Sequence, residues 1–283
     1  MKRIQIEQDW PESWKASYPY DLEEIYGEPS NLGYANAYKN RKNIALKLIE
    51  EVLSPGAHIL DIAGAQGNFS LALAEKGYKV TWNDLRADLV EYVRMKQESG
   101  IINFAPGNAF DLKFPELFDA VLITEVIEHV AHPDQFLEKV ASLVKPGGYI
   151  VMTTPNGAYF RNSLPKFSDC PDSSIFESVQ FKPNSDGHIF LLHSEEIYSF
   201  ADASGLSVEK LSLFTNPLTS GHMKLGFALK LFPKGFVEMV EQATQRLPSA
   251  IAKHLLIHIA ARFRKPPAAE HGIEPCLESA RPI

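Results

Sequence analysis

The chain has few cysteines and no long apolar run. Its two cysteines, Cys170 and Cys276, lie far apart with no C-x-x-C or paired spacing, which excludes a disulfide framework and a cysteine-based zinc site. The first residues, Met-Lys-Arg-Ile-Gln-Ile-Glu, lack the apolar segment of a secretory signal. No uncharged apolar run reaches the roughly 18 residues of a membrane span. We therefore expect a cytoplasmic protein with two ordinary thiols.

Basic residues are also not in surplus. The chain has 28 lysines and arginines against 35 acidic residues, a net charge of −7. Because the neutralisation of phosphates needs an excess of lysine and arginine, this balance argues against extended contact with nucleic acid, and we expect no nucleic-acid partner. With 283 residues, of which 45% are hydrophobic, the chain can form one large domain with an appendage.

Segments with helix and strand periodicity alternate through the first half of the chain. We predict helices at 40–53, 68–76, 86–98 and 133–144, and strands at 57–62, 78–83, 101–105, 118–124 and 148–154. A helix that Ser194 caps and strands at 206–213 and 225–231 follow. This alternation is typical of an α/β fold with a doubly wound, mostly parallel, Rossmann-like sheet.

The segment Ile59–Asn68, ILDIAGAQGN, carries the strongest functional signal. An apolar strand ends in Asp61 and is followed by a tight turn of small residues and an amphipathic segment. Small residues let backbone N–H groups approach a ligand closely, and Asp61 lies where doubly wound sheets bind cofactors. The next strand ends in Asn83 and Asp84, and Asp84 follows Asp61 by about the 20-residue interval at which an acid meets a ribose diol. The residues of the turn are Ala63, Gly64, Ala65 and Gly67.

Further motifs follow in a fixed order. They are Gly107-Asn108-Ala109, the strand 118–124 leading into EVIEHV at 125–130, KPGG at 145–148 and Thr153-Thr154-Pro155-Asn156. Together they resemble the class I S-adenosylmethionine-dependent methyltransferases, and within these the ubiquinone-biosynthesis O-methyltransferases and their broad kin. The resemblance covers about residues 40–210, and it implies S-adenosylmethionine as the cofactor.

The turn departs from the family pattern D-x-G-x-G-x-G. Ala63 and Ala65 stand at its first two glycine positions, and only Gly67 matches. If these positions need positive φ, which is costly for alanine, we expect the loop to re-form around Gly64. A nicotinamide site would show G-x-G-x-x-G, and a phosphate site disfavours a facing carboxylate. An acidic site that tolerates alanine suits a cationic sulfonium better.

The resemblance assigns cofactor contacts residue by residue. Asp84 is expected to bind the ribose hydroxyls, the turn to pass beneath the methionine part, and Glu125 to close the site. In Asn108, which replaces a common aspartate, an amide oxygen can still accept a hydrogen bond from adenine. Tyr38 and Arg41 are candidates to hold the cofactor carboxylate, the arginine through its paired N–H donors. The alternative, in which Tyr38 only packs and Arg41 is only solvated, stays equally open. The full expected set is Tyr38, Arg41, Asp61, Ala63, Gly64, Ala65, Gly67, Asn83, Asp84, Asn108, Ala109, Thr124 and Glu125.

A second set of residues indicates catalysis. Glu125, Glu128 and His129 lie at i, i+3 and i+4, so a helical turn beginning at the strand end would place them on one face. With His188 they could hold Mg²⁺, Mn²⁺ or Zn²⁺, and this pattern looks like the E-x-x-E-H…H set of ribose-methylating small-RNA methyltransferases. In the alternative, His129 is a general base and the glutamates, Glu128 in particular, orient it. Both interpretations stay open.

The ends of the chain have different characters. We predict an aromatic-rich cap at 1–38, a methyltransferase domain at 39–232 with an insertion at 155–187 over the active site, a basic amphipathic helical extension at 233–265 and a mobile tail at 266–283. Residues 222–265 contain eight basic residues against two glutamates, a balance of +6 that leaves −13 for the rest. A helix at 249–264 with Ile251, Leu255 and Ile259 in one apolar row would pack internally or at a homodimer seam, or lie on a membrane surface.

The expected activity is O-methylation of a hydroxyl group on a small or lipid-like molecule. C- or N-methylation of a small metabolite, metal-dependent ribose methylation of RNA, and a non-catalytic adenosyl-binding subunit remain as alternatives. Nothing readable in the cap or the insertion identifies the acceptor.

Overall fold

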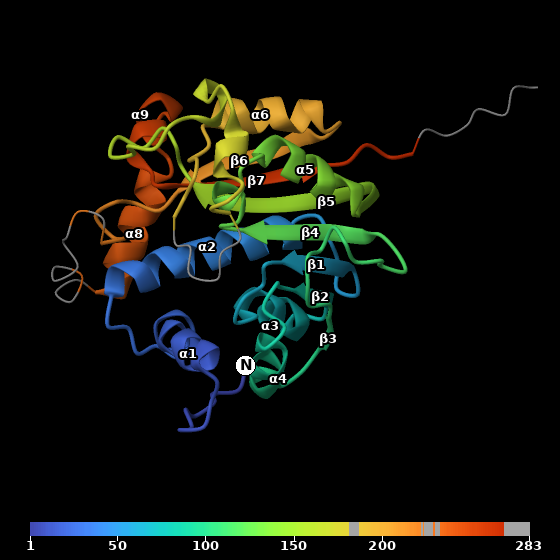
Figure 1. Ribbon diagram of the computed structural model, residues 1–283. Helices are drawn as coiled ribbons and strands as arrows, with labels where there is room; N and C mark the ends of the chain where they lie inside the picture. Colours follow the sequence, from blue (N-terminus) through green and yellow to red (C-terminus); the bar gives the residue numbers. More distant parts are fainter. Residues whose placement is uncertain (181–186, 222, 224–228, 230–232, 269–283) are drawn as a thin grey trace, which may run out of the picture.

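The computed structural model describes residues 1–180, 187–221, 223, 229 and 233–268. Its centre is a seven-stranded sheet with strand order β3-β2-β1-β4-β5-β7-β6 (Figure 1). Strands β1 to β5 run parallel, and β7 is antiparallel to both of its neighbours. The strands are His58–Ile62 (β1), Lys79–Asn83 (β2), Ile101–Phe104 (β3), Phe118–Thr124 (β4), Val144–Pro155 (β5), Ser207–Phe214 (β6) and His258–Arg264 (β7). The predicted α/β fold is confirmed.

Helices cover both faces of the sheet (Figure 1). The α-helices are Glu12–Glu24 (α1), Leu32–Glu50 (α2), Asn68–Glu75 (α3), Leu89–Lys96 (α4), Pro133–Ser142 (α5), Ser194–Ala203 (α6), Lys234–Thr244 (α8) and Ser249–Leu255 (α9). Short 3₁₀ turns lie at Ile127–His129 (η1), Phe167–Asp169 (η2) and Ser173–Phe176 (η3). No helix in the described ranges is long and apolar enough to cross a membrane.

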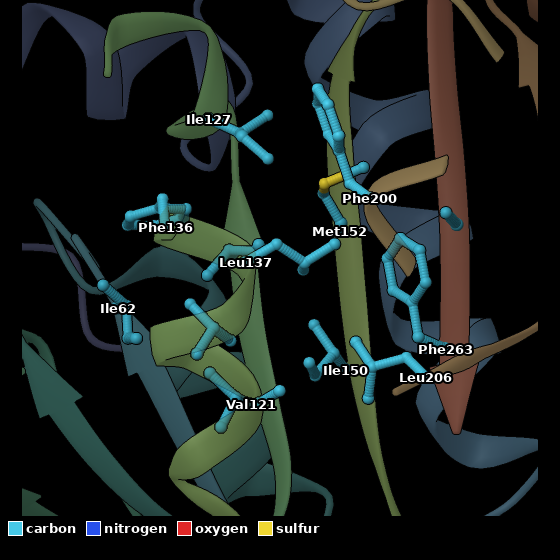
Figure 2. Close-up of a cluster of buried hydrophobic side chains, with 14 of the residues drawn as sticks. Ile62, Val121, Ile127, Phe136, Leu137, Ile150, Met152, Phe200, Leu206 and Phe263 are labelled. Atoms are coloured by element: carbon cyan, nitrogen blue, oxygen red, sulfur yellow. The ribbon is translucent and has the colours of Figure 1, made fainter. Parts of the chain in front are cut away.

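Alternate residues of the central strands fill two separate cores. In β4, Val121 and Ile123 pack toward α5 and α6, whereas Ala120 and Leu122 pack toward α2 and α3. Figure 2 shows the first of these cores, where Leu137 and Phe136 of α5 meet side chains of β1, β4 and β5. Because every central strand is buried on both faces, its sequence is almost continuously apolar.

The strand order reverses beside β1. The chain runs outward through β2 and β3 on one side of β1 and returns to β4 on the other side. In doubly wound sheets, ligands bind at the carboxyl edge where the strand order reverses, which is here between β1 and β4. The antiparallel β7 begins at this same edge, because His258 pairs with Pro155 at the end of β5.

The N-terminal segment is fastened to α3 and α4 by a buried polar network. Lys96 Nζ lies 2.7 Å from Asp21 Oδ2 and 2.7 Å from Asn68 Oδ1, and both charged side chains are fully buried. Tyr92 donates to the same Asp21 oxygen at 2.6 Å. Asn68 also donates to Glu24 Oε2 at 2.9 Å, so α1 is bonded directly to the first residue of α3.

Several predicted elements have different bounds. Helix α2 begins at Leu32, not at residue 40, because Asn31 caps it by accepting a hydrogen bond from the backbone N–H of Tyr34 at 3.1 Å. It runs across the predicted boundary between cap and domain. His193, not Ser194, is the N-cap residue of α6, where the Glu196 side chain accepts from the His193 N–H at 2.8 Å.

The predicted helix at 249–264 is wrong. Helix α9 ends at Leu255, and His258–Arg264 form strand β7 inside the sheet. Ile259 is fully buried there, but Ile251 is 54% exposed, so the two never share an apolar row. The extension at 233–265 is therefore two helices and a strand. The strand predicted at 225–231 falls almost wholly outside the described residues, as does most of the tail at 266–283.

Candidate active site

The turn after β1 keeps the backbone conformation that glycines would favour. Ala63 has φ +56° and Ala65 has φ +45°, while Gly67 has φ +73° and caps α3. The expectation that the loop re-forms around Gly64 is wrong, since the two alanines adopt the left-handed region themselves at a cost of about 1–2 kcal/mol each. Gly64 is required for another reason: a Cβ there would lie 2.7 Å from the Trp82 ring.

Asp61 lies beneath this turn and is almost fully buried. Ser70 donates to its Oδ2 at 2.6 Å, whereas Oδ1 has no hydrogen-bond partner among the described residues. Burial raises the pKa of Asp61 to about 7, against the opposing effect of the Ser70 hydrogen bond and with the nearby Asp84 charge adding to the rise. An unpartnered, buried carboxyl oxygen at this edge is suited to a cationic or hydrogen-bond-donating ligand.

Asp84 joins the end of β2 to the turn after β1. Its Oδ2 accepts a hydrogen bond from the Ala65 N–H at 2.9 Å, and its Oδ1 accepts from the Arg86 N–H at 2.9 Å. The neighbouring Asn83 side chain donates to the carbonyls of Ala105 and Gly107 at 2.6 and 2.9 Å. Asn83 thus holds the loop after β3, while Asp84 directly follows β2 and holds the turn after β1.

The loop that follows β3 contains the predicted adenine contacts. The side chain of Asn108 accepts from the Phe110 N–H at 3.2 Å and donates to Asp111 at 2.9 Å, while Ala109 is buried against the main core. The Asn108 amide is thus fixed by its neighbours at the predicted position.

Glu125 directly follows β4, whose last residue is the half-buried Thr124, and its carboxylate pairs with Arg41 and not with the other predicted catalytic residues. It has φ +54°, and its Oε2 lies 3.2 Å from Arg41 Nη1 and 3.7 Å from His258 Nε2. Burial opposes its ionisation, but Arg41 and His258 together hold the pKa of Glu125 below its usual range. The expected single helical face shared by Glu125, Glu128 and His129 does not form, because this backbone and the η1 turn replace it.

Arg41 and Tyr38 line the same edge from α2. The Arg41 guanidinium lies over the Tyr38 ring at 5.1 Å, and its Nε is buried without a hydrogen-bond partner in the described ranges. Both residues line a cavity of about 300 Å³ together with Tyr34 and His258. One edge of the guanidinium is therefore engaged by Glu125, and its Nε side can still bind an anion.

Glu128, His129 and His188 form the cluster that the sequence predicted, without Glu125. One potential ligand atom of each lies within 4.8 Å of the others. Burial raises the pKa of Glu128 well above its usual range, with the Glu125 charge adding to the rise, and Thr154 donates to its Oε2 at 3.1 Å. The His129 ring meets His188 edge to face at 4.9 Å, and burial lowers the pKa of His188. The cluster can hold a divalent ion or present an imidazole base.

The sequence interpretation missed His258, which it placed in a helix. Its ring stacks on Phe214 at 5.2 Å with a 26° tilt and faces Glu125. Phe214 also lines a larger cavity of about 1120 Å³ between α2, β6, α8 and α9. A run of alternating apolar residues after Leu256 is the signal that could have predicted a strand here.

A family model described as a methyltransferase domain matches residues 35–211. The chain belongs to this methyltransferase family. A ubiquinone biosynthesis O-methyltransferase from Xanthomonas campestris is 38% identical over 109 residues, which are 37% of this chain and 46% of that protein. The chain thus spans about half the length of the curated relatives that it matches.

Solved structures agree on the fold of this methyltransferase domain. N-methyltransferase NodS from Bradyrhizobium japonicum, in complex with S-adenosyl-L-homocysteine, has a TM-score of 0.50 at 16% identity, and the match covers 90% of this chain and all of that one. The [4+2]-cyclase SpnF has a TM-score of 0.53 at 18% identity, covering 90% and 96%. Since one of these neighbours is named a cyclase, the fold by itself does not define the reaction.

Proposed function

We propose that the protein is an S-adenosylmethionine-dependent methyltransferase that methylates a hydroxyl group of a small or lipid-like molecule. The observation that carries this proposal is the set of unpartnered polar atoms at the carboxyl edge of β1 and β4. Asp61 Oδ1, Glu125 Oε1 and Arg41 Nε are buried without hydrogen-bond partners in the part of the chain that the structure describes. Buried polar atoms of this kind are costly unless a ligand satisfies them.

Their chemistry fits the proposed cofactor. S-adenosylmethionine, when bound, supplies a methyl group on an already activated, cationic sulfonium. Three carboxyl groups, of Asp61, Asp84 and Glu125, suit its positive charges and ribose hydroxyls, and Arg41 suits its carboxylate. Tyr38 would support Arg41, the backbone of Ala63 to Gly67 would lie beneath the methionine part, and Asn108 and Ala109 would contact the adenine.

The comparisons support an oxygen atom as the acceptor of the methyl group. The matched relative is named an O-methyltransferase, whereas NodS is named an N-methyltransferase. The cavity of about 1120 Å³ beside Phe214 has room for a lipid-like acceptor, and its lining combines apolar side chains such as Leu213 and Val237 with amides and lysines.

Thermal-shift titration with S-adenosylhomocysteine and mass spectrometry for a product heavier by one methylene test the proposal. Binding without any product from an extract would favour a non-catalytic subunit.

For the proton of the acceptor we propose His129 as general base, oriented by Glu128. Near pH 7 only about one in a thousand phenol-like hydroxyls is ionised, and a base that accepts the proton in the transition state can recover much of that factor. His129 Nδ1 lies 3.2 Å from the Gly187 carbonyl, an arrangement that fixes the ring while its Nε2 remains the catalytic atom. Holding donor and acceptor in line can supply a further ~7–11 kcal/mol.

A divalent ion at Glu128, His129 and His188 is the second candidate, favoured by the 4.8 Å clustering of their ligand atoms. Such an ion would lower the pKa of the acceptor hydroxyl directly. We expect activity to survive exhaustive chelation, because the base alone suffices. Loss of nearly all activity on chelation, with recovery on adding Mg²⁺, Mn²⁺ or Zn²⁺, would instead establish the metal site.

A further inference from the structure

The Glu125 carboxylate has two nitrogen neighbours, the Arg41 guanidinium and the His258 imidazole, where a simple ion pair needs one. Arg41 Nη1 lies 3.2 Å from Glu125 Oε2, and His258 Nε2 lies 3.7 Å from the same oxygen. Glu125 also carries positive φ, a conformation that for a residue with a side chain persists only where the surroundings enforce it. Its backbone is fixed by a hydrogen bond from its N–H to the Thr153 carbonyl at 2.9 Å.

His258 is held rigidly in front of Glu125. The N–H of the preceding residue, Ile257, donates to the Thr215 carbonyl at 3.1 Å, and the Ile257 carbonyl accepts from the Asn156 N–H at 2.9 Å. The Asn156 side chain donates to the carbonyls of Lys253 and Leu256 at 2.8 and 2.7 Å, which fixes the turn between α9 and β7. The Phe214 ring stacks on the imidazole and limits its tilt.

We propose that His258 is a positioning residue for cofactor binding, which shares the Glu125 carboxylate with Arg41 and so leaves Arg41 available to the carboxylate of S-adenosylmethionine. This inference rests on the function proposed above. Arg41 has one nitrogen on Glu125 and a buried Nε without a partner among the described residues. When the cofactor carboxylate arrives, two carboxylates compete for one guanidinium.

The N–H of His258 relieves this competition. Its Nε2 lies 3.7 Å from Glu125 Oε2, so a small approach lets it donate to that oxygen when Arg41 turns part of its charge to the ligand. Without His258, Arg41 would carry more of the Glu125 charge, and a ligand carboxylate would bind a guanidinium that is already largely neutralised. Without His258, only ligands that carry the amino-acid carboxylate should lose affinity, since the adenosine part binds at Asp84 and Asn108.

The experiment compares two ligands in two variants by calorimetry. S-adenosylhomocysteine carries the amino-acid carboxylate, and 5′-methylthioadenosine has the same nucleoside without it. His258→Phe keeps a ring that can stack on Phe214 but removes the N–H, and His258→Gln restores an N–H near the Nε2 position. We expect His258→Phe to weaken S-adenosylhomocysteine binding roughly tenfold and to leave methylthioadenosine binding unchanged, with His258→Gln recovering most of the loss.

Two controls separate this role from general damage. His58→Phe alters a similar histidine, 3.1 Å from Glu116 and packed on Phe118, at the opposite edge of the sheet, and should change neither affinity. In a Glu125→Gln background, His258→Phe should cause no further loss, because the competing charge is gone. If His258→Phe loses affinity equally for both ligands, or binds S-adenosylhomocysteine as wild type does, the inference is overturned. A wild-type protein that binds neither ligand would instead refute the proposed function.

Discussion

At the scale of single residues, the turn after β1 shows how chemistry and backbone strain are combined. Ala63 and Ala65 occupy left-handed conformations that glycine adopts at no cost, yet Gly64 between them has ordinary φ and is needed to admit the Trp82 ring. A residue-type pattern alone assigns positive φ to glycine, which is why the sequence predicted a re-formed loop. The folded surroundings decide the conformation, since Asp84 binds the Ala65 N–H and Trp82 Nε1 donates to the Ala65 carbonyl at 3.1 Å.

Asp84→Ala is expected to weaken cofactor binding. The change removes the proposed acceptor of the ribose hydroxyls and releases the Ala65 N–H, so we expect a loss of about 1.5–3 kcal/mol of S-adenosylhomocysteine affinity. Calorimetry on a variant shown to be folded measures this loss. Asp202→Ala, at an exposed position on α6, serves as the control and should bind normally. Unchanged affinity in the folded Asp84→Ala variant would remove Asp84 from the ribose site.

Asp61 should make stability depend on pH. Its pKa rises from an ordinary 3.8 to about 7 in the folded protein, so the folded state binds more protons than the unfolded state between these values. The unfolding free energy therefore falls as pH increases from about 4 to about 7, by at most about 4 kcal/mol. Asp61→Asn removes this term, and its stability relative to wild type should increase over that range.

Urea unfolding at pH 5 and pH 8 without ligand measures the effect. The unfolding free energy of Asp61→Asn minus that of wild type should be clearly more positive at pH 8 than at pH 5. For Asp202→Asn the same quantity should be equal at the two pH values. Equal differences at the two pH values for Asp61→Asn would mean that the buried carboxyl keeps an ordinary pKa.

At the scale of elements, the prediction from the sequence was most accurate where the residues fitted only one spacing, either helical or extended. The strand 118–124 was predicted with the bounds that the structure shows, because its apolar run is flanked by clear turn signals. Strand β7 failed because Ile251, Leu255 and Ile259 are spaced by four and no glycine or proline separates them. The strand signal, apolar residues at every second position from Ile257 to Phe263, is present but overlaps this helical spacing at Ile259. The contact between Glu125 and His258 could not be predicted without that strand.

The anchoring of α1 should depend on the buried Lys96–Asp21 pair. Lys96→Met leaves the Asp21 carboxylate buried without its charge partner, so we expect a loss of about 3–5 kcal/mol in unfolding free energy. Asp21→Leu removes the other charge and also leaves Tyr92 without its acceptor. The double variant should be less destabilised than the sum of the two single variants. Urea unfolding of all four proteins measures this coupling, and additive losses would show that the pair contributes no interaction energy.

At the scale of the whole molecule, the basic C-terminal region is tied to the acidic remainder of the chain. Arg262 pairs with Glu51 at 2.8 Å and with Glu209 at 3.2 Å, and Arg264 lies 3.5 Å from Glu209. Lys265 donates to the carbonyls of Ala141 and Val144, both at 2.9 Å. Three of the eight basic residues in 222–265 are therefore already bonded within the fold, and this favours internal packing over membrane contact.

If these charges met an anionic bilayer, each would add about 1 kcal/mol and binding would weaken with salt. We expect the wild-type protein not to cosediment with anionic liposomes at low or physiological salt. Leu255→Asp, in the half-buried last turn of α9, should lower stability without changing liposome association, and Ile259→Asp should lower it far more because Ile259 is fully buried in β7. Salt-sensitive cosedimentation that Lys253→Glu abolishes in a folded, cofactor-binding protein would contradict this expectation and indicate that the exposed side of α9, with Ile251 at its surface, meets a membrane that carries the acceptor.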